Sequence, residues 1–137
     1  MYLLDTNVVS ELRKARPHGG VVAWLQSVRD ADLALSAVSL GEIQRGIAIT
    51  QEQDADKAEQ LTAWADRLCA THKILPMDAQ TFRVCARLMH RQSDALYEDA
   101  MIAATALVHQ LTVVTRNVRD FAHFRVAVLN PFNHKMA

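Results

Sequence analysis

Residues 2–7 are YLLDTN, and this short stretch decides how the rest of the sequence is interpreted. Tyr2, Leu3 and Leu4 follow one another, which is typical of a strand buried on both faces. Asp5 comes directly after them, so the strand ends on a carboxylate. A charged group in a buried place is costly to desolvate unless it has partners. The sequence therefore raises the question of which residues gather around Asp5.

The composition predicts one globular domain over residues 1–137. Half of the 137 residues are hydrophobic and 22% are charged, which is typical of a chain that buries a core. We find no apolar run of about 18 residues and no secretion signal, so we expect neither a membrane span nor export. Cys69 and Cys85 do not form a close pair of the metal or redox type, and we expect both to stay reduced in the cytoplasm.

Alternating strand and helix patterns predict an α/β fold. We expect strands at residues 2–4, 33–36, 74–75, 112–114 and 126–128, and helices at 6–14, 21–25, 39–50, 54–71, 78–91 and 100–108. Short aliphatic strands between helices favour a five-stranded parallel sheet in a three-layer arrangement. In such sheets ligands bind beyond the carboxyl ends of the strands, where Asp5 would lie.

Three further acids are expected at the same edge. Glu42 follows the second strand in SAVSLGEIQRG, Asp99 opens the apolar helix in YEDAMIAATAL, and Asp120 follows the fourth strand in VVTRNVRDF. A cluster of carboxylates raises its own pKa values unless cations fill it. Hard oxygen ligands suit Mg²⁺ or Mn²⁺, which can activate a water for phosphodiester cleavage.

Each of these acids also has a purely structural interpretation. Ser39-x-x-Glu42 matches a capping box at a helix start. Asp99 can complement a helix N-terminus, and Asp120 can occupy a turn or an N-cap. Asp5 is the hardest to explain structurally, since an acid that ends a buried strand needs partners. The common placement of the acids beside strands favours the joint interpretation as a metal site.

The chain resembles the PIN-domain proteins, and among them the VapC-like and FitB-like toxins of bacterial toxin–antitoxin pairs. The matching segments are LLDTNVVSEL, SAVSLGEIQRG, EDAMIAATAL, LTVVTRNVRDF and VAVLNPF, and the resemblance as a whole extends from Tyr2 to Phe132. The resemblance implies a PIN fold over the whole chain and an endoribonuclease that depends on Mg²⁺ or Mn²⁺.

The resemblance also implies roles for individual residues. The acidic metal site would consist of Asp5, Glu42, Asp99 and Asp120, and the supporting polar residues would be Asn7, Thr115 and Asn117. Asp94 and Glu98 flank the third motif, but the pattern DAMIAATA begins at Asp99, which we therefore prefer. Asp120 is the acid that varies most within the family, and it can act through water.

Substrate and partner contacts are expected close to these acids. Arg116 and Arg119 lie beside Asp120 in a loop that leaves the fourth strand, where they would contact RNA or form surface salt bridges. The resemblance implies a small antitoxin whose C-terminal segment places an Arg or Lys in the acidic pocket. The helices with Trp24 and Trp64 would offer its apolar groove, unless both side chains are core residues or seal a homodimer.

We expect a toxin that cleaves RNA, with three alternatives. A housekeeping PIN nuclease would process RNA without a neighbouring antitoxin gene. A partner-binding subunit would use the acidic pocket to hold a basic tail and would cleave RNA weakly or not at all. A phosphatase-like enzyme would use Asp5 as a nucleophile, but such enzymes usually have a second Asp where Asn7 stands. The six histidines show no zinc-ligand spacing.

Overall fold

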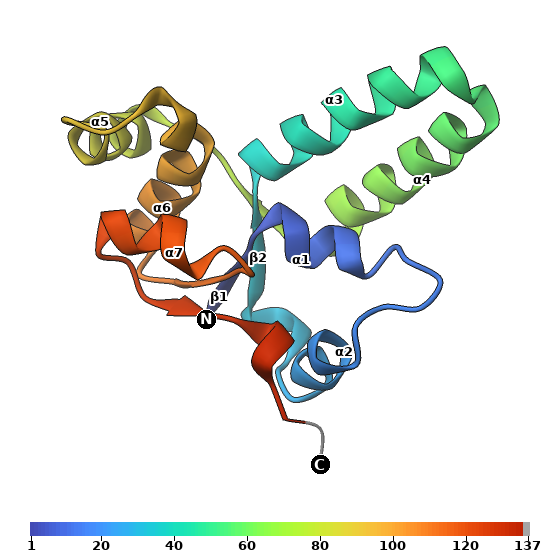
Figure 1. The fold of residues 1–137 in the computed structure, drawn as a ribbon, viewed down its shortest axis with the longest axis horizontal. Helices are drawn as coiled ribbons and strands as arrows, with labels where there is room; N and C mark the ends of the chain where they lie inside the picture. The colour runs from blue at the N-terminus through green and yellow to red at the C-terminus, as the bar shows by residue number, and fades with distance from the viewer. Residues whose placement is uncertain (136–137) are drawn as a thin grey trace.

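A computed structural model describes residues 1–135 and shows a five-stranded, all-parallel sheet between two groups of helices (Figure 1). Residues 136–137, the end of the expected domain, lie outside the described residues. The strands are β1 (Tyr2–Leu4), β2 (Leu33–Ser36), β3 (Lys73–Leu75), β4 (Thr112–Val114) and β5 (Val128–Leu129). Their order across the sheet is β3-β2-β1-β4-β5, so β1 lies at the centre. The α/β class and the parallel sheet predicted from the sequence are confirmed.

The helices alternate with the strands along the chain. The α-helices are α1 (Thr6–Glu11), α2 (Gly19–Gln26), α3 (Ala37–Gln53), α4 (Ala55–Thr71), α5 (Ala79–Leu88), α6 (Tyr97–His109) and α7 (Val118–Phe121). Short 3-10 turns are η1 (Asp30–Asp32), η2 (Asp94–Leu96), η3 (Ala122–Phe124) and η4 (Pro131–Asn133). In the described residues, no helix is both long and apolar enough to cross a membrane.

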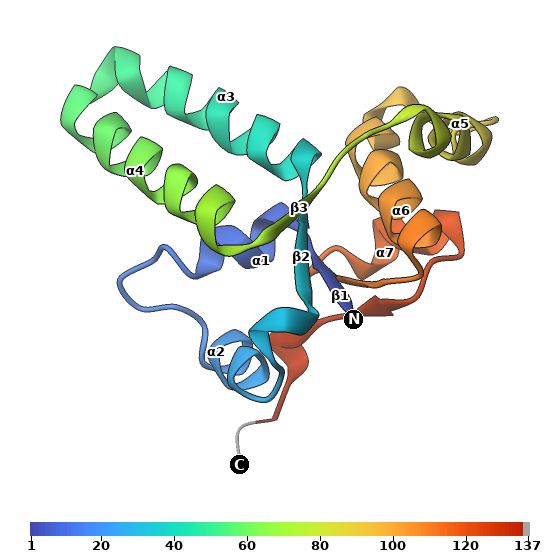
Figure 2. The ribbon, with the colours of Figure 1, turned by 180° about the vertical axis from the view of Figure 1, so that it is seen from behind.

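Each face of the sheet has its own hydrophobic core, because neighbouring strand residues point to opposite faces. Leu3 and Val113 pack against α5, α6 and α7, whereas Leu4 and Val114 pack against α1 to α4. Figures 1 and 2 show these two helix groups on opposite sides of β1 and β2, with α3 and α4 forming a long pair that extends beyond the sheet. The arrangement has three layers, as the sequence predicted.

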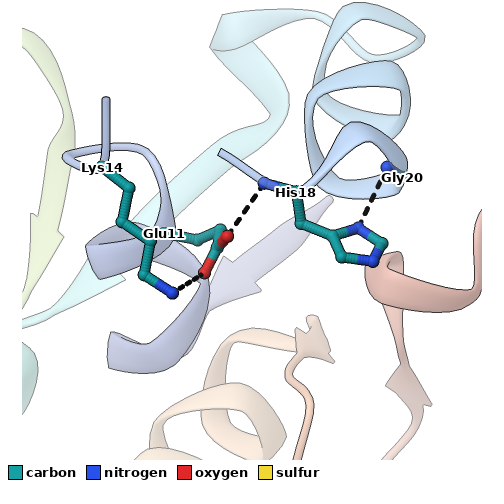
Figure 3. A network of polar contacts seen from close by, with 4 residues as sticks. All are labelled: Glu11, Lys14, His18 and Gly20. Carbon is teal, nitrogen blue, oxygen red and sulfur yellow. Dashed lines mark hydrogen bonds and ion pairs between the residues drawn. The ribbon is translucent and has the colours of Figure 1, made fainter. Parts of the chain in front are cut away.

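Several boundaries differ from those predicted. The first helix ends at Glu11 rather than near residue 14, because the Glu11 carboxylate accepts hydrogen bonds from Lys14 Nζ and the His18 backbone N–H and folds the chain back (Figure 3). The glycine pair predicted to end that helix instead opens α2, where His18 Nδ1 accepts from the Gly20 N–H at 3.0 Å.

Two element boundaries later in the chain also differ from those predicted. The helix predicted to end near residue 91 ends at Leu88, and Arg91 has a left-handed backbone with φ 62°. The last strand is Val128–Leu129 rather than 126–128, because Arg125 also takes a left-handed conformation and the pairing then aligns Val113 with Val128. These shifts leave the order of elements unchanged.

Candidate active site

Asp5 lies at the junction of β1 and α1, where it caps the helix. Its side chain is 5% exposed and accepts hydrogen bonds from the Thr6 N–H at 2.8 Å, Thr115 Oγ1 at 2.8 Å and Asn7 Nδ2 at 3.2 Å. Burial raises the pKa of Asp5 even though all three hydrogen bonds lower it. The carboxylate is thus held in a fixed orientation while its charge remains poorly compensated.

The three polar residues named from the resemblance surround Asp5. Thr115 is fully buried, and its hydroxyl donates to Asp5 while accepting from Asn7 Nδ2 at 3.3 Å and the Asn117 N–H at 2.9 Å. Asn7 Oδ1 also accepts from the Arg116 N–H at 3.2 Å. Asn117 contributes to this network through its backbone rather than through a side-chain cap. The network joins the end of β4 to the start of α1.

Glu42 approaches the same region from α3. Thr6 Oγ1 lies 2.8 Å from Ser39 Oγ and 3.1 Å from Glu42 Oε1, so Ser39 can donate to Thr6 while Thr6 donates to Glu42. Burial first, then the negative charges of Glu98 and Asp5, raise the pKa of Glu42 to about 7. Thr6 and Ser39 were not selected from the sequence as site residues, although Thr6 belongs to the opening DTN motif.

The capping-box interpretation of Glu42 is wrong. The helix begins at Ala37, with Ser36 as its N-cap, and Ser36 Oγ accepts from the Val38 N–H at 3.0 Å. Ser39 lies inside the first turn and is fully buried. β2 continues through Ser36 directly into α3, so the earlier serine takes the capping position and Glu42 lies beyond the N3 site of a capping box.

Asp99 lies in the first turn of α6, which begins at Tyr97 rather than at Asp99 itself. A role limited to the helix N-terminus would lower the pKa of this carboxyl. Instead burial, followed by the charges of Asp5, Asp120 and Glu98, raises the pKa of Asp99 to about 6. Asp99 therefore lies within electrostatic reach of two of the other predicted site acids.

The flanking acids have different surroundings. Asp94 begins the 3-10 turn η2, and Glu98 forms an ion pair with Arg45 of α3 at 3.1 Å. Asp120 lies in the short helix α7, not in a loop, and the N-cap of that helix is Asn117. The turn and N-cap interpretations of Asp120 are therefore wrong. The Thr115 hydroxyl accepts from the Asn117 N–H, which turns the chain early enough for α7 to form.

The four predicted site acids come from four different segments and influence one another. Asp5 raises the pKa values of Glu42 and Asp99, and Asp120 raises that of Asp99. Among the described residues, none of the four forms a salt bridge. A carboxylate cluster whose members form no ion pair has the donor chemistry that Mg²⁺ and Mn²⁺ prefer.

The spacing of these acids limits how a metal would be held. Within residues 1–135, no three His, Cys, Asp or Glu side chains stand close enough to hold one ion directly. Mg²⁺ usually keeps several water ligands and uses only one or two protein carboxylates, so the residues fit such an ion in part through water. PIN-domain ribonucleases in general depend on a divalent metal.

The basic and aromatic residues near the site fall into two groups. Arg116 and Arg119 are exposed, and neither forms a salt bridge within the part of the chain that the structure describes. The Arg116 guanidinium lies 4.6 Å from the centre of the Phe132 ring. Both arginines are therefore free to meet an anionic ligand, and the alternative of a surface salt bridge is not observed. Arg119 itself lies in α7 rather than in the predicted loop.

The two tryptophans differ in exposure. Trp24 is 4% exposed and packs edge-on against Tyr2 at 5.1 Å, so it belongs to the core and cannot line a binding groove. Trp64 is only partly buried, and with Arg13 and Leu61 it lines a surface hollow of about 370 Å³ between α1 and α4. The groove predicted from both tryptophans is thus wrong for Trp24.

Fold and site together define an α/β protein with a parallel sheet and an acidic cluster beyond the end of its central strand. The PIN domain family model matches residues 2–127, and the chain belongs to the PIN-domain family. The resemblance found in the sequence is confirmed.

Similar proteins cover nearly the whole chain. Toxin FitB of Neisseria gonorrhoeae is 35% identical over 97% of this chain and 99% of its own, and the crystal structure of FitAcB from that organism matches with a TM-score of 0.86. VapC ribonuclease Y4jK of Sinorhizobium fredii is 34% identical over 96% of this chain and 98% of its own. A toxin–antitoxin complex from Klebsiella pneumoniae contains a chain 25% identical, with a TM-score of 0.67 and coverage of 96% and 98%.

Proposed function

We propose that this chain is the toxin of a toxin–antitoxin pair and that it is a metal-dependent endoribonuclease, a hydrolase that cleaves RNA phosphodiester bonds. The observation that carries the proposal is the set of four mutually influencing carboxylates without salt-bridge partners in the described residues. Similarity to proteins named toxin FitB and VapC ribonuclease over nearly the whole chain supports it.

In this proposal Asp5, Glu42, Asp99 and Asp120 hold Mg²⁺ or Mn²⁺, partly through water. The bound ion would supply Lewis-acid stabilisation of the scissile phosphate and lower the pKa of the attacking water. Thr115 and Asn7 keep the Asp5 carboxylate in one orientation, and Thr6 does the same for Glu42. Fixed ligands of this kind reduce the reorganisation needed when charge develops at the phosphate.

RNA and antitoxin would meet the chain on neighbouring surfaces. Arg116 and Arg119, which are both exposed, would contact the RNA backbone beside the acids. For the antitoxin, we propose a segment that packs its apolar residues against Trp64 and Leu61 and places an Arg or Lys among the acids. Such a cation would occupy the place of the metal and keep the enzyme inactive.

We further propose that residues 1–137 are a single PIN domain, that it forms a homodimer or a larger assembly with the antitoxin, and that it acts in the cytoplasm. The pairing of β5 with β4 near the end of the chain supports one domain. An RNA substrate and two cysteines that form no disulfide, Cys69 and Cys85, support a cytoplasmic setting.

The purified chain tests the enzymatic part. Wild type and Asp99→Asn are incubated with a pool of cellular RNA, with EDTA or with Mn²⁺. We expect cleavage by the wild type only with Mn²⁺ and none by the variant. Equal cleavage by both proteins would place the activity in a contaminant or another site, and no cleavage by either would favour the partner-binding subunit.

Co-expression tests the partner. The product of the small open reading frame next to this gene is expressed with the chain, and we expect a stable complex without RNase activity. Activity should return when the basic residue that enters the acidic pocket is changed to Ala. A complex that cleaves RNA as fast as the free chain, or no complex, would favour the RNA-processing enzyme.

A further inference from the structure

A hollow of about 360 Å³ opens beside Glu42, between α3, α6 and the segment that joins β3 to α5. Val38, Met77 and Met101 form its apolar lining, and all three pack against the core on that face of the sheet. The Thr105 hydroxyl lies 3.5 Å from Met77 Sδ. The hollow is shallow and open to solvent, so a ligand in it would stay partly exposed.

The rim of this hollow carries opposite charges on neighbouring helices. Arg45 Nη1 of α3 donates to Glu98 Oε1 of α6 at 3.1 Å, and the side chains are 66% and 42% exposed. That contact uses one guanidinium N–H and one carboxylate oxygen. A guanidinium has further N–H donors and a carboxylate has further lone pairs, so the pair presents both donors and acceptors to a ligand.

We propose that this hollow binds a guanine base of a single-stranded RNA substrate beside the phosphate that the acids attack. The inference rests on the proposed RNase function and names a specificity site for it. Glu42 lines both the hollow and the acidic cluster, so a base in the hollow and a phosphate at the acids belong to the same or adjacent nucleotides.

The chemistry of the hollow favours guanine among the bases. Guanine has two adjacent N–H donors, N1 and N2, which match the Glu98 carboxylate, and acceptors at O6 and N7, which match the Arg45 guanidinium. Proteins recognise single-stranded RNA through bases that leave the stack and bind to side chains. The polarisable thioethers of Met77 and Met101 make favourable contacts with an aromatic ring.

Gly41 offers a way to fill this hollow without disturbing the backbone. It lines the hollow, and a Cβ built there meets nothing within 4 Å. Gly41→Leu should therefore be tolerated while it takes the space of the base. Ala48→Leu is the matched control, because it adds the same side chain to an exposed position of the same helix.

The test uses short single-stranded RNA oligonucleotides that differ only in having G, A, C or U at one position of a constant background. Wild type and Ala48→Leu should give a kcat/KM at least tenfold higher for the G substrate. Gly41→Leu should lose the preference and give a similar kcat/KM for all four substrates. Glu98→Gln, which changes a partly exposed side chain, should also reduce the preference for G.

Thermal melts confirm that the variants are folded, and light scattering gives their oligomeric states. A preference for G that survives Gly41→Leu and Glu98→Gln would overturn the subsite and leave the RNase proposal intact. A preference for C would overturn the assignment to guanine. A changed oligomeric state in Gly41→Leu would assign the hollow to a second copy of the chain. Failure of the wild type to cleave any RNA would overturn the RNase proposal, and the subsite with it.

Discussion

The six-residue helix α1 has a buried carboxylate at each end, and the two differ in their partners. Asp5 caps the N-terminus and is 5% exposed, while Glu11 is the last residue and is 7% exposed. The negative charge of Asp5 raises the pKa of Asp99, another acid, whereas the Glu11 carboxylate forms an ion pair with Lys14. Both carboxylates have little accessible surface, but burial is the main cause of the raised pKa of Asp5, whereas for Glu11 it ranks below the hydrogen bonds from Lys14 and His18.

The contacts of Glu11 explain its behaviour. One oxygen pairs with Lys14 Nζ at 2.8 Å and the other accepts from the His18 N–H at 2.8 Å (Figure 3). The hydrogen bond from Lys14 is the largest cause of the lowered pKa of Glu11, and the bond from His18 comes next. Burial raises the pKa of a carboxyl group, but a hydrogen-bonded cation lowers it. Glu11 thus fixes the chain between α1 and α2.

Asp5 shows the opposite balance, and so do the acids it influences. Hydrogen bonds orient Asp5 without neutralising it, and burial raises its pKa. Carboxyl groups with strongly perturbed pKa values are enriched at functional sites. The comparison teaches that depth of burial and the charge of the partners together separate an acid that anchors the chain from one that can bind a cation.

The largest expected effect comes from removing one charge of the acidic cluster. Asp99→Asn and Asp5→Asn keep the shape of the side chain but lose a negative charge, so we expect Mn²⁺-dependent cleavage to fall by at least about 100-fold. Both variants should remain folded, because Asn keeps the shape of each side chain and at position 5 can still cap α1 by accepting from the Thr6 N–H. Cleavage rates with saturating Mn²⁺ and circular dichroism measure the two parts. Wild-type rates in both variants would remove these residues from the site.

Glu42→Gln separates activity from stability at a single position. The amide keeps an acceptor for the Thr6 hydroxyl but cannot serve as an anionic ligand, so cleavage should fall by about 10-fold to 100-fold. Without metal, the variant should be more stable than the wild type at pH 7 by about 1–2 kcal/mol, since the raised pKa marks an unfavourable charge. Urea unfolding in EDTA checks this. A less stable variant would assign Glu42 an anchoring role like that of Glu11.

The acidic cluster also predicts how pH and metal affect the wild type. Folded-state pKa values of about 7 for Glu42 and about 6 for Asp99 exceed their ordinary values of 4.5 and 3.8. These groups favour folding when protonated, so their contribution is lost as pH rises from about 4 to about 7. Millimolar Mn²⁺ should restore stability at pH 7 through binding linkage. Thermal melts in EDTA at several pH values test the loss of stability as pH rises, and melts with Mn²⁺ at pH 7 test the stabilisation by metal. A melting temperature that does not change with Mn²⁺ at pH 7 would contradict the predicted metal binding.

The sequence could predict that these acids lie near one edge of the sheet because the rule behind that prediction is topological. In a parallel sheet, residues that follow different strands reach the same edge, so Asp5 and Thr115 meet although 110 positions separate them. Strand and helix periodicity was sufficient for that inference. The roles of the acids still await the substitutions proposed above.

Features that depend on the exact register of the strands, such as helix caps and strand boundaries, could not be predicted from the sequence. Ser36 and Ser39 are both suitable N-caps, and only the pairing of β2 with β3, which extends to Ser36, decides between them. The position of β5 depends on the left-handed Arg125. The role of Glu11 was missed because its two partners come from a chain reversal that no periodic pattern announces.

The smallest predicted effect concerns Glu11, and it has the opposite sign to that of the cluster. The lowered pKa means that Glu11 stabilises the fold above its ordinary value of 4.5 and that this contribution is lost as pH falls. Glu11→Gln keeps an acceptor for the His18 N–H but loses the ion pair with Lys14, so its melting temperature at pH 7 should be slightly below that of the wild type. In acid, the melting temperatures of Glu11→Gln and the wild type should become equal. The higher stability of Glu42→Gln should also disappear in acid, so the two variants approach the wild type from below and from above, respectively.

RNA cleavage by Glu11→Gln with saturating Mn²⁺ should stay at the wild-type rate, because Glu11 lies at the far end of α1 from Asp5. If cleavage by Glu11→Gln fell as far as in Asp99→Asn, Glu11 and the acidic cluster would have to be treated as one site.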